Sequence, residues 1–331
     1  MGENRPVIVR WGLGELPAVL AELGVERPLL VTSSRWAAFD LPVDLRYSGV
    51  GAHADARGVE GAVEAARSGG ADGLVALGGG SAIDSAKAAS TETGLLVISI
   101  PTTYSGAEWT PFFGSRDPAT GIKRAGSGAR VEAIVYEPTL TIGLPPSETG
   151  GTALNALAHC AEALYTRNRA PETDRDALAG ARLISDWLPV AIADGSDLEA
   201  RTELLRGAMH AGAALRAGMG VSHAMAQALG GRFALSHGAM NAVCLPAGLR
   251  FNSEVAAAEL ARFGETMGHA EPIERVADLA ALAGPTRLRD YGVPREQLPA
   301  VAEAASERAA AKANPRPAPP EAVLELLESV W

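Results

Sequence analysis

Residues 74–89 read LVALGGGSAIDSAKAA, and this stretch decides the fold. The apolar run Leu74–Leu77 predicts a buried strand, three glycines and a serine follow it, and Ala82–Ala89 continues as a helix. Glycines permit a tight strand-to-helix turn with close backbone approach, and the free N–H groups and dipole at a helix start favour a phosphate. The stretch therefore predicts a pyrophosphate site, although a turn that is merely tight has the same pattern.

The same strand-then-helix pattern repeats through residues 1–145. Five more β-rich runs alternate with amphipathic segments, and they read PVIVRW, RPLLVTSS, DLRYS, GLLVISIPTT and VEAIVYEP. Such alternation predicts a parallel sheet with helices on both faces, and a sheet of this kind binds ligands beyond the carboxyl ends of its strands. We expect residues 1–145 to form a Rossmann-like α/β domain that binds a dinucleotide.

Long Ala- and Leu-rich periodic stretches replace the strands from residue 146 onward. They predict an all-α helical domain over residues 146–331, which would carry the substrate and the catalytic groups. A chain of 331 residues is long enough for two domains, because single cores stop growing at about 250–300 residues.

The composition argues against several classes of partner. The net charge is −10, with acidic and basic residues interspersed, so nothing attracts a nucleic acid backbone or an anionic membrane surface. No apolar run approaches the ~20 residues of a membrane span, and the first residues lack the layout of a signal peptide. Cys160 and Cys244 lie in apolar patterns, which fits a reducing compartment. We expect a cytoplasmic protein that acts on a small molecule.

Four of the residues with imidazole or amide side chains in the helical half form a candidate site. Asn155 and His159 are four residues apart, so on a helix both side chains leave one face. His223 and His237 lie in the segment 220–241, which reads GVSHAMAQALGGRFALSHGAMN. Together these residues could hold a metal, move a proton or fill a core.

Taken together and in this order, the segments resemble the iron-containing alcohol dehydrogenase superfamily, and more closely its maleylacetate reductase branch. The resemblance is carried by GGGSAIDSAK (78–87), IPTTYSGAEWTPFFG (100–114), NALAHCAEALYT (155–166), and GVSHAMAQALGG with SHGAMNAVCLP (220–246). It implies the dehydroquinate synthase-like architecture, in which a dinucleotide domain precedes an all-helical one. It also implies hydride transfer in the cleft between the domains, and a homodimer.

The resemblance implies which residues bind NADPH or NADH. The turn that follows Pro101 adds two hydroxyls at the same sheet edge as the glycine turn, though such a turn can also cap its own backbone. In LLVTSSRW, Ser33 stands where an acidic residue would bond the adenosine ribose, and Arg35 is close by, so we expect NADPH to be accepted. The residues implied in cofactor binding are Gly79, Gly80, Ser81, Asp84, Thr102, Thr103, Ser33 and, near the nicotinamide ribose, Lys123.

The metal-dependent members of the family bind one divalent ion with an aspartate and three histidines, which correspond here to Asn155, His159, His223 and His237. An Asn carbonyl offers only a dipole where a carboxylate offers charge, so affinity for Zn²⁺ or Fe²⁺ should fall. The maleylacetate reductase branch shares this Asn, and the resemblance implies that it works without a metal. We expect no tightly held catalytic metal, with these four residues as the ligands if one is bound.

A second departure from the family is Gln227, four residues after His223, where another histidine usually faces the nicotinamide. Gln cannot titrate, whereas reduction of a ketone leaves an alkoxide that must be stabilised and protonated. We expect His237 to donate the proton and Gln227 to orient the substrate oxygen. His223 and His159 would polarise or position the substrate, with Asn155 as a hydrogen-bond partner.

The sequence thus predicts an NAD(P)H-dependent reductase of a small oxo-acid or ketone. One alternative is a Zn²⁺- or Fe²⁺-dependent alcohol dehydrogenase, and another is a non-redox enzyme or binding protein that retains the fold. A dicarboxylate substrate would need cationic partners. Arg232 and Arg250 are near the histidines in sequence, although long side chains on helices are more often solvated surface groups.

Overall fold

The computed structural model describes residues 7–116 and 123–331. The chain divides into two compact units, Met1–Thr141 and Ile142–Trp331. Among the described residues, no helix is both long enough and apolar enough to cross a membrane.

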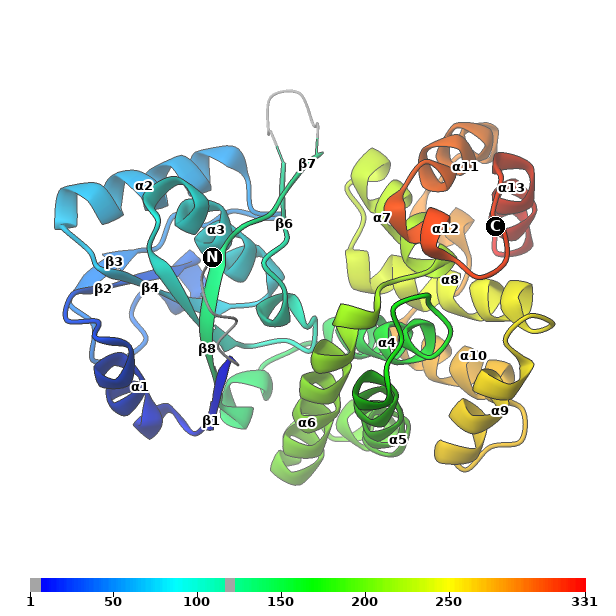
Figure 1. Ribbon diagram of the computed structural model, residues 1–331, viewed down its shortest axis with the longest axis horizontal. Coiled ribbons are helices and arrows are strands. Elements are labelled where there is room, and N and C mark those ends of the chain that lie inside the picture. The colour runs from blue at the N-terminus through cyan, green and yellow to red at the C-terminus, as the bar shows by residue number, and fades with distance from the viewer. Residues whose placement is uncertain (1–6, 117–122) are drawn as a thin grey trace. The chain divides into compact units, whose positions relative to one another are not determined.

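The first unit is built on a parallel sheet of six strands in the order β1-β8-β5-β4-β2-β3 (Figure 1). Each of the six runs predicted from the sequence forms one strand. Strands β2, β4 and β5 are buried along their whole length, which explains their uninterrupted apolar sequences. The strands are β1 (Ile8–Trp11), β2 (Pro28–Thr32), β3 (Leu45–Tyr47), β4 (Gly73–Gly78), β5 (Leu96–Pro101) and β8 (Arg130–Tyr136).

Helices cover both faces of this sheet, because neighbouring residues of a strand point to opposite sides. The side that Leu77 faces is covered by α1 (Leu16–Leu23). The side that Ala76 faces is covered by α2 (Ala56–Gly69) and α3 (Gly80–Thr93) (Figure 1). The expected Rossmann-like arrangement is therefore confirmed.

An antiparallel pair, β6 (Phe113–Arg116) and β7 (Lys123–Gly126), forms a separate two-stranded sheet in the same unit. The two strands read FGSR and KRAG, and neither alternates apolar with polar residues. The period that identifies a half-buried strand is absent, so the sequence does not predict this hairpin.

The second unit is all-helical, as predicted. Its site is carried by α4 (Pro146–Ala163), α7 (Val221–Phe233) and α8 (His237–Asn252). The other helices are α5 (Pro171–Ala193), α6 (Leu198–Ala214), α9 (Ala257–Thr266), α10 (Pro272–Ala283), α11 (Leu298–Ser306), α12 (Ala309–Ala313) and α13 (Pro320–Ser329).

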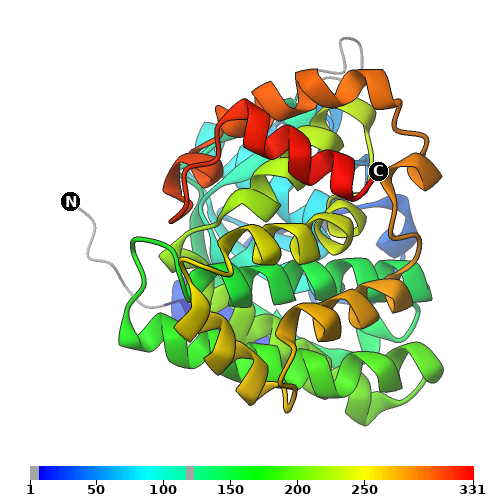
Figure 2. The same ribbon diagram turned by 90° about the vertical axis from the view of Figure 1, so that its right-hand side faces the viewer.

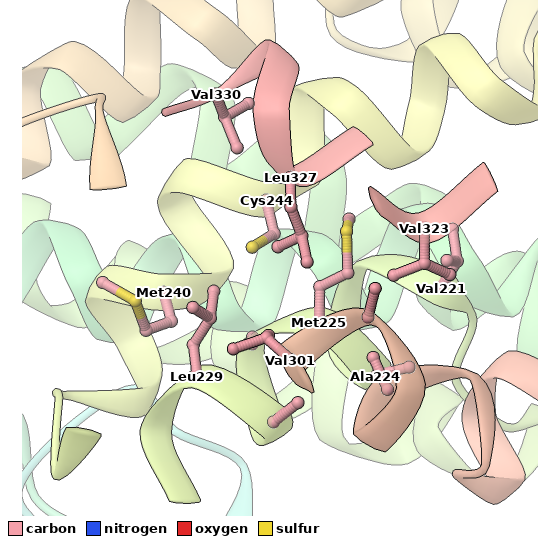
Figure 3. Packing of buried hydrophobic residues seen from close by; sticks show 14 of the residues in the cluster. Val221, Ala224, Met225, Leu229, Met240, Cys244, Val301, Val323, Leu327 and Val330 are labelled. Atoms are coloured by element: carbon pink, nitrogen blue, oxygen red, sulfur yellow. The ribbon is translucent and has the colours of Figure 1, made fainter. Parts of the chain in front are cut away.

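One hydrophobic cluster joins α7 and α8 to the C-terminal helices. Figure 3 shows Leu229 of α7 and Cys244 of α8 packed with Val301 of α11 and Leu327 of α13. The red helix α13 lies beside the orange α11 in both views (Figure 2). The cluster holds the last forty residues of the chain against the helix that carries His223 and Gln227.

Candidate active site

The predicted cofactor residues of the first unit gather at the carboxyl ends of three neighbouring strands. Ser33 follows β2, Gly79 follows β4 and Thr103 follows β5, and these strands are adjacent in the sheet. A Cβ on Gly79 would lie only 2.8 Å from Thr103 Cγ2, so the glycine turn and the threonine turn touch. Thr102 N also donates to Gly78 O at 3.0 Å.

The start of α3 suits an anion. Gly79 is its N-cap and provides no side chain, so backbone groups of the first turn can meet a phosphate. Ser81 Oγ accepts a hydrogen bond from His53 N at 3.0 Å. His53 and Ala54 both have positive φ, 59° and 50°, a strained conformation that brings this loop against the glycine turn. No motif of the sequence predicts this contact.

Asp84 is engaged within the unit. Its Oδ1 pairs with Lys87 Nζ at 3.0 Å, and its Oδ2 accepts from Gly114 N at 3.0 Å. The buried Lys87 ammonium also donates to Ala107 O at 2.6 Å. The pair fixes the segment that follows the threonine turn, and contact between Asp84 and the cofactor stays a prediction. The side chain of Lys123, the first residue of β7, lies outside the described part of the chain.

The same segment holds a buried acid. Glu108 Oε1 accepts from the Tyr136 hydroxyl at 3.0 Å, and Trp109 Nε1 donates to that hydroxyl at 2.8 Å. Burial raises the pKa of Glu108 to about 6. A backbone hydrogen bond, the Tyr136 hydroxyl and the charge of Lys87 oppose this shift. A buried carboxyl group with a raised pKa therefore lies in the segment that follows the threonine turn.

In the second unit, the structure brings the three predicted histidines together. His159 comes from α4, His223 from α7, and His237 is the first residue of α8. The rings of His159 and His223 stack, with 4.6 Å between their centroids and 14° between their planes. The centroids of His223 and His237 are 5.9 Å apart. His159 and His223 are buried, whereas His237 is only half-buried.

Glycines allow α8 to begin close to α4. A Cβ on Gly238 would lie 2.6 Å from the carbonyl carbon and oxygen of Gly151. This approach lets Asn241 Nδ2 donate to Asn155 Oδ1 at 2.8 Å and lie 3.1 Å from His237 Nε2. If Asn241 donates to Nε2, the neutral His237 ring carries its hydrogen on Nδ1. Asn241 is a site residue that the sequence did not reveal.

Glu162 organises the cluster, although the sequence did not single it out. Its buried Oε2 lies 2.6 Å from His223 Nδ1 and accepts from Gly220 N at 2.7 Å, while Oε1 accepts from Ser222 N at 2.9 Å. The carboxylate thus caps the start of α7 from a different helix. The one available signal was its position three residues after His159, on the same face of α4.

These contacts set the protonation of the buried groups. Burial alone would raise the pKa of Glu162, but His223 and the backbone donors outweigh it and hold that pKa below its ordinary value. The carboxylate favours a hydrogen on His223 Nδ1, and the buried Nε2 has no hydrogen-bond partner among the described residues. Burial, and then the charges of His223 and His237, lower the pKa of His159 well below its usual range. His159 is therefore a neutral ring.

The remaining predicted residues lie at the edge of the cluster. Gln227 is partly buried on α7, and its Oε1 accepts from Arg308 Nη1 at 3.3 Å. Arg232 is exposed and donates to Gln297 Oε1, and Arg250 is exposed. The cation that contacts Gln227 is thus Arg308, which belongs to the C-terminal segment.

The side chains that would hold a metal ion are partly bonded to one another. Within residues 7–116 and 123–331, no three His, Cys, Asp or Glu side chains form a ligand set. The stacked rings of His159 and His223 have their lone pairs in nearly parallel planes, whereas a tetrahedral site needs lone pairs that converge. Asn155 Oδ1 accepts from Asn241, and the nearby carboxylate of Glu162 is bonded to His223. These two oxygen ligands are therefore occupied, whereas His223 Nε2 is not bonded to any described residue.

Comparison with known proteins agrees with the geometry of both units. The family models that match are "Iron-containing alcohol dehydrogenase" over residues 6–132 and "Fe-containing alcohol dehydrogenase family, C-terminal" over residues 149–331. The chain is 40% identical over 276 residues to maleylacetate reductase of Burkholderia cepacia. The aligned region covers 82% of this chain and 77% of that protein. The crystal structure of maleylacetate reductase from Rhizobium sp. strain MTP-10005 is 32% identical, with a TM-score of 0.90 over 100% of this chain and 97% of that one. That of a 1,3-propanediol oxidoreductase is 26% identical, with a TM-score of 0.90 over 98% of each chain.

The chain belongs to the iron-containing alcohol dehydrogenase family, and it is an NAD(P)-dependent oxidoreductase. Within that family its relatives place it in the maleylacetate reductase branch. The family and the branch are those that the motifs of the glycine turn, the threonine turn and the histidine segment predict.

Proposed function

We propose that this chain reduces a small oxo-acid of the maleylacetate type, with a histidine as proton donor and without a catalytic metal. The names of the relatives from Burkholderia cepacia and Rhizobium support this class of substrate. The observation that carries the proposal is the histidine cluster itself. His223 is bonded to Glu162 and His237 to Asn241, and the rings of His159 and His223 stack with nearly parallel planes, so their lone pairs do not aim at one point.

Bound NADPH or NADH would supply the hydride. When hydride adds to a carbonyl carbon or to an enone, the displaced electron pair moves to oxygen, which becomes an alkoxide or an enolate. The protein must stabilise that negative charge and then deliver one proton, which is work for an imidazolium. In a metal-dependent relative a Lewis acid could hold the oxygen, and here the histidine cluster would do so.

His237 suits the role of proton donor. It is half-buried, whereas His159 and His223 are buried. The lowered pKa of His159 makes that ring a poor source of a proton at neutral pH. Glu162 would hold His223 beside that ring.

The cofactor site supports the use of NADPH as well as NADH. A carboxylate at the end of β2 would repel a 2′-phosphate, but Ser33 offers only a hydroxyl there. The neighbouring Arg35 side chain is exposed on the η2 turn (Ser34–Trp36) and could meet that phosphate.

His237→Ala tests the proton donor. General acid–base groups contribute roughly 10²–10⁴-fold, so we expect kcat for NAD(P)H oxidation with maleylacetate to fall by at least about tenfold. His210→Ala is the control, because His210 lies in the same unit but is bonded to Asp176 at 3.0 Å, outside the cluster. A His237→Ala protein that keeps more than about a tenth of the wild-type kcat would contradict the assignment.

A further inference from the structure

Arg308 is a half-buried cation without an anionic partner. It lies between α11 and α12, and no carboxylate of the described residues comes within 4.0 Å of its guanidinium. Of its five donors, Nη1 donates to Gln227 Oε1 and Nη2 to Gln227 O, both at 3.3 Å. Both bonds are long for an N–H donor, and the buried Nε has no partner. A desolvated charge left this way is unfavourable, so the position is suited to an incoming anion.

The packing of the C-terminal helices fixes this guanidinium beside α7. Ala305 on one side of Arg308 and Ala310 on the other are buried in the cluster that includes Leu229 of α7. Figure 3 shows Val301, from the helix that precedes Arg308, against Leu229 and Met225. The backbone at Arg308 therefore cannot move away from α7 without disturbing a packed core.

The face of α7 that Arg308 contacts begins at His223. Gln227 follows one turn later and Gly231 one turn after that, so all three lie on one side of the helix. Gly231 has no side chain, and a Cβ there would lie 3.8 Å from Arg308 Nη2. Four residues of helix advance about 6 Å. One small molecule could thus place an acid group at the guanidinium and a carbonyl group at the histidine cluster, with a few carbon atoms between the two groups.

We propose that Arg308 binds a carboxylate of the substrate, with Gln227 as the group that holds the guanidinium in place until the substrate arrives. This inference rests on the proposed function, because it assigns the acid group of the oxo-acid. Arginine presents parallel N–H donors that match the two oxygens of a carboxylate. Glutamine at position 227 suits this role, because its Oε1 accepts a hydrogen bond from Arg308. A protonated histidine at the same position would have no acceptor atom.

Binding of maleate, a dicarboxylate that cannot accept hydride at a ketone, tests the assignment. We expect Arg308→Gln to raise the Kd of maleate, measured by titration calorimetry, by about 10- to 100-fold. The Kd of the Arg308→Lys protein should lie between those of the wild type and Arg308→Gln, because lysine keeps the positive charge but lacks the parallel N–H donors of arginine. Lys312→Gln is the matched control, since Lys312 is an exposed cation of the same short helix, paired with Glu307 at 2.8 Å. Its Kd should equal that of the wild type.

Two outcomes would overturn the proposal: wild-type protein that does not bind maleate, or equal Kd values for the wild type and Arg308→Gln. If Arg308 served only to fasten α12 to α7, Arg308→Gln would lower the melting temperature while the folded protein kept its affinity. Turnover of maleylacetate is assayed separately. Wild-type protein that binds maleate through Arg308 but does not oxidise NAD(P)H would refute the reductase proposal and leave this one standing.

Discussion

Glu162 is the residue whose contacts most directly set the chemistry of the histidine cluster. It is a buried anion that serves both the start of α7 and the Nδ1 atom of His223. A carboxylate in this position orients an imidazole and selects its tautomer, as outer partners of functional histidines do. It touches no expected substrate atom, so we regard it as a positioning residue.

Glu162→Gln keeps the shape of the side chain and removes its charge. One of its two acceptor oxygens becomes an amide nitrogen, which would face a backbone donor of Gly220 or Ser222. We expect kcat with maleylacetate to fall about 10- to 100-fold while KM for NAD(P)H stays unchanged. The free energy of unfolding should fall by about 1–3 kcal/mol.

Glu148→Gln is the matched control, because Glu148 lies on the same helix and is exposed. Steady-state kinetics and urea denaturation are measured on both variants. Equal kcat values for the two would show that Glu162 does not act on His223 in the reaction.

At this scale the sequence could predict only residues that belong to motifs. His159, His223 and His237 attract notice because imidazoles at such spacing are rarely core residues. Glu162 does not, since a Glu on an Ala-rich helix has the pattern of a solvated face until the partner helix is known. The role of Arg308 is also hidden in the sequence, because its partner Gln227 lies 81 residues away along the chain.

At the scale of elements, the site depends on how closely α4 and α8 approach. Gly151 and Gly238 meet backbone to backbone, and this contact sets the position of His237, which precedes Gly238. A side chain at the crossing would separate the helices and lengthen the bond between Asn241 and Asn155. The two glycines therefore control the geometry of the cluster without taking part in it.

Gly238→Ala tests this dependence. The new Cβ would lie 2.6 Å from the carbonyl group of Gly151, which is backbone and cannot rotate away. We expect a loss of about 1–3 kcal/mol in the free energy of unfolding and a lower kcat in the protein that remains folded. Denaturation followed by circular dichroism measures the first quantity.

Gly231→Ala provides the comparison for stability. A Cβ there meets nothing closer than 3.8 Å, and alanine favours a helix over glycine by up to about 1 kcal/mol. Its stability should equal or exceed that of the wild type. A Gly238→Ala protein as stable as Gly231→Ala would mean that α4 and α8 can separate at no cost.

The elements themselves were largely predictable. The strands β2, β4 and β5 follow apolar runs, because burial on both faces leaves a continuous signal in the sequence. The hairpin of β6 and β7 was not predictable, since its short strands have no apolar face. The glycine contact between α4 and α8 was also hidden, because only tertiary packing distinguishes a glycine at a helix crossing from any other.

At the scale of the whole molecule, the chain keeps the architecture of the iron-containing alcohol dehydrogenase family, and we propose that its histidine site transfers a proton. The family models cover both halves of the chain, so the fold and the class of cofactor are those of the family. The expected departures are Asn155 and Gln227, which are bonded to Asn241 and Arg308 respectively.

The most direct test is turnover by metal-free protein. The enzyme is treated with a chelator, its zinc and iron contents are measured by mass spectrometry, and oxidation of NADPH and of NADH is followed with maleylacetate. We predict that protein with far less than one metal ion per chain retains full kcat with at least one of the two cofactors, and that added Zn²⁺ or Fe²⁺ does not raise it. Loss of turnover in proportion to the metal removed, with recovery on adding Zn²⁺ or Fe²⁺, would contradict a reaction carried by the histidines alone.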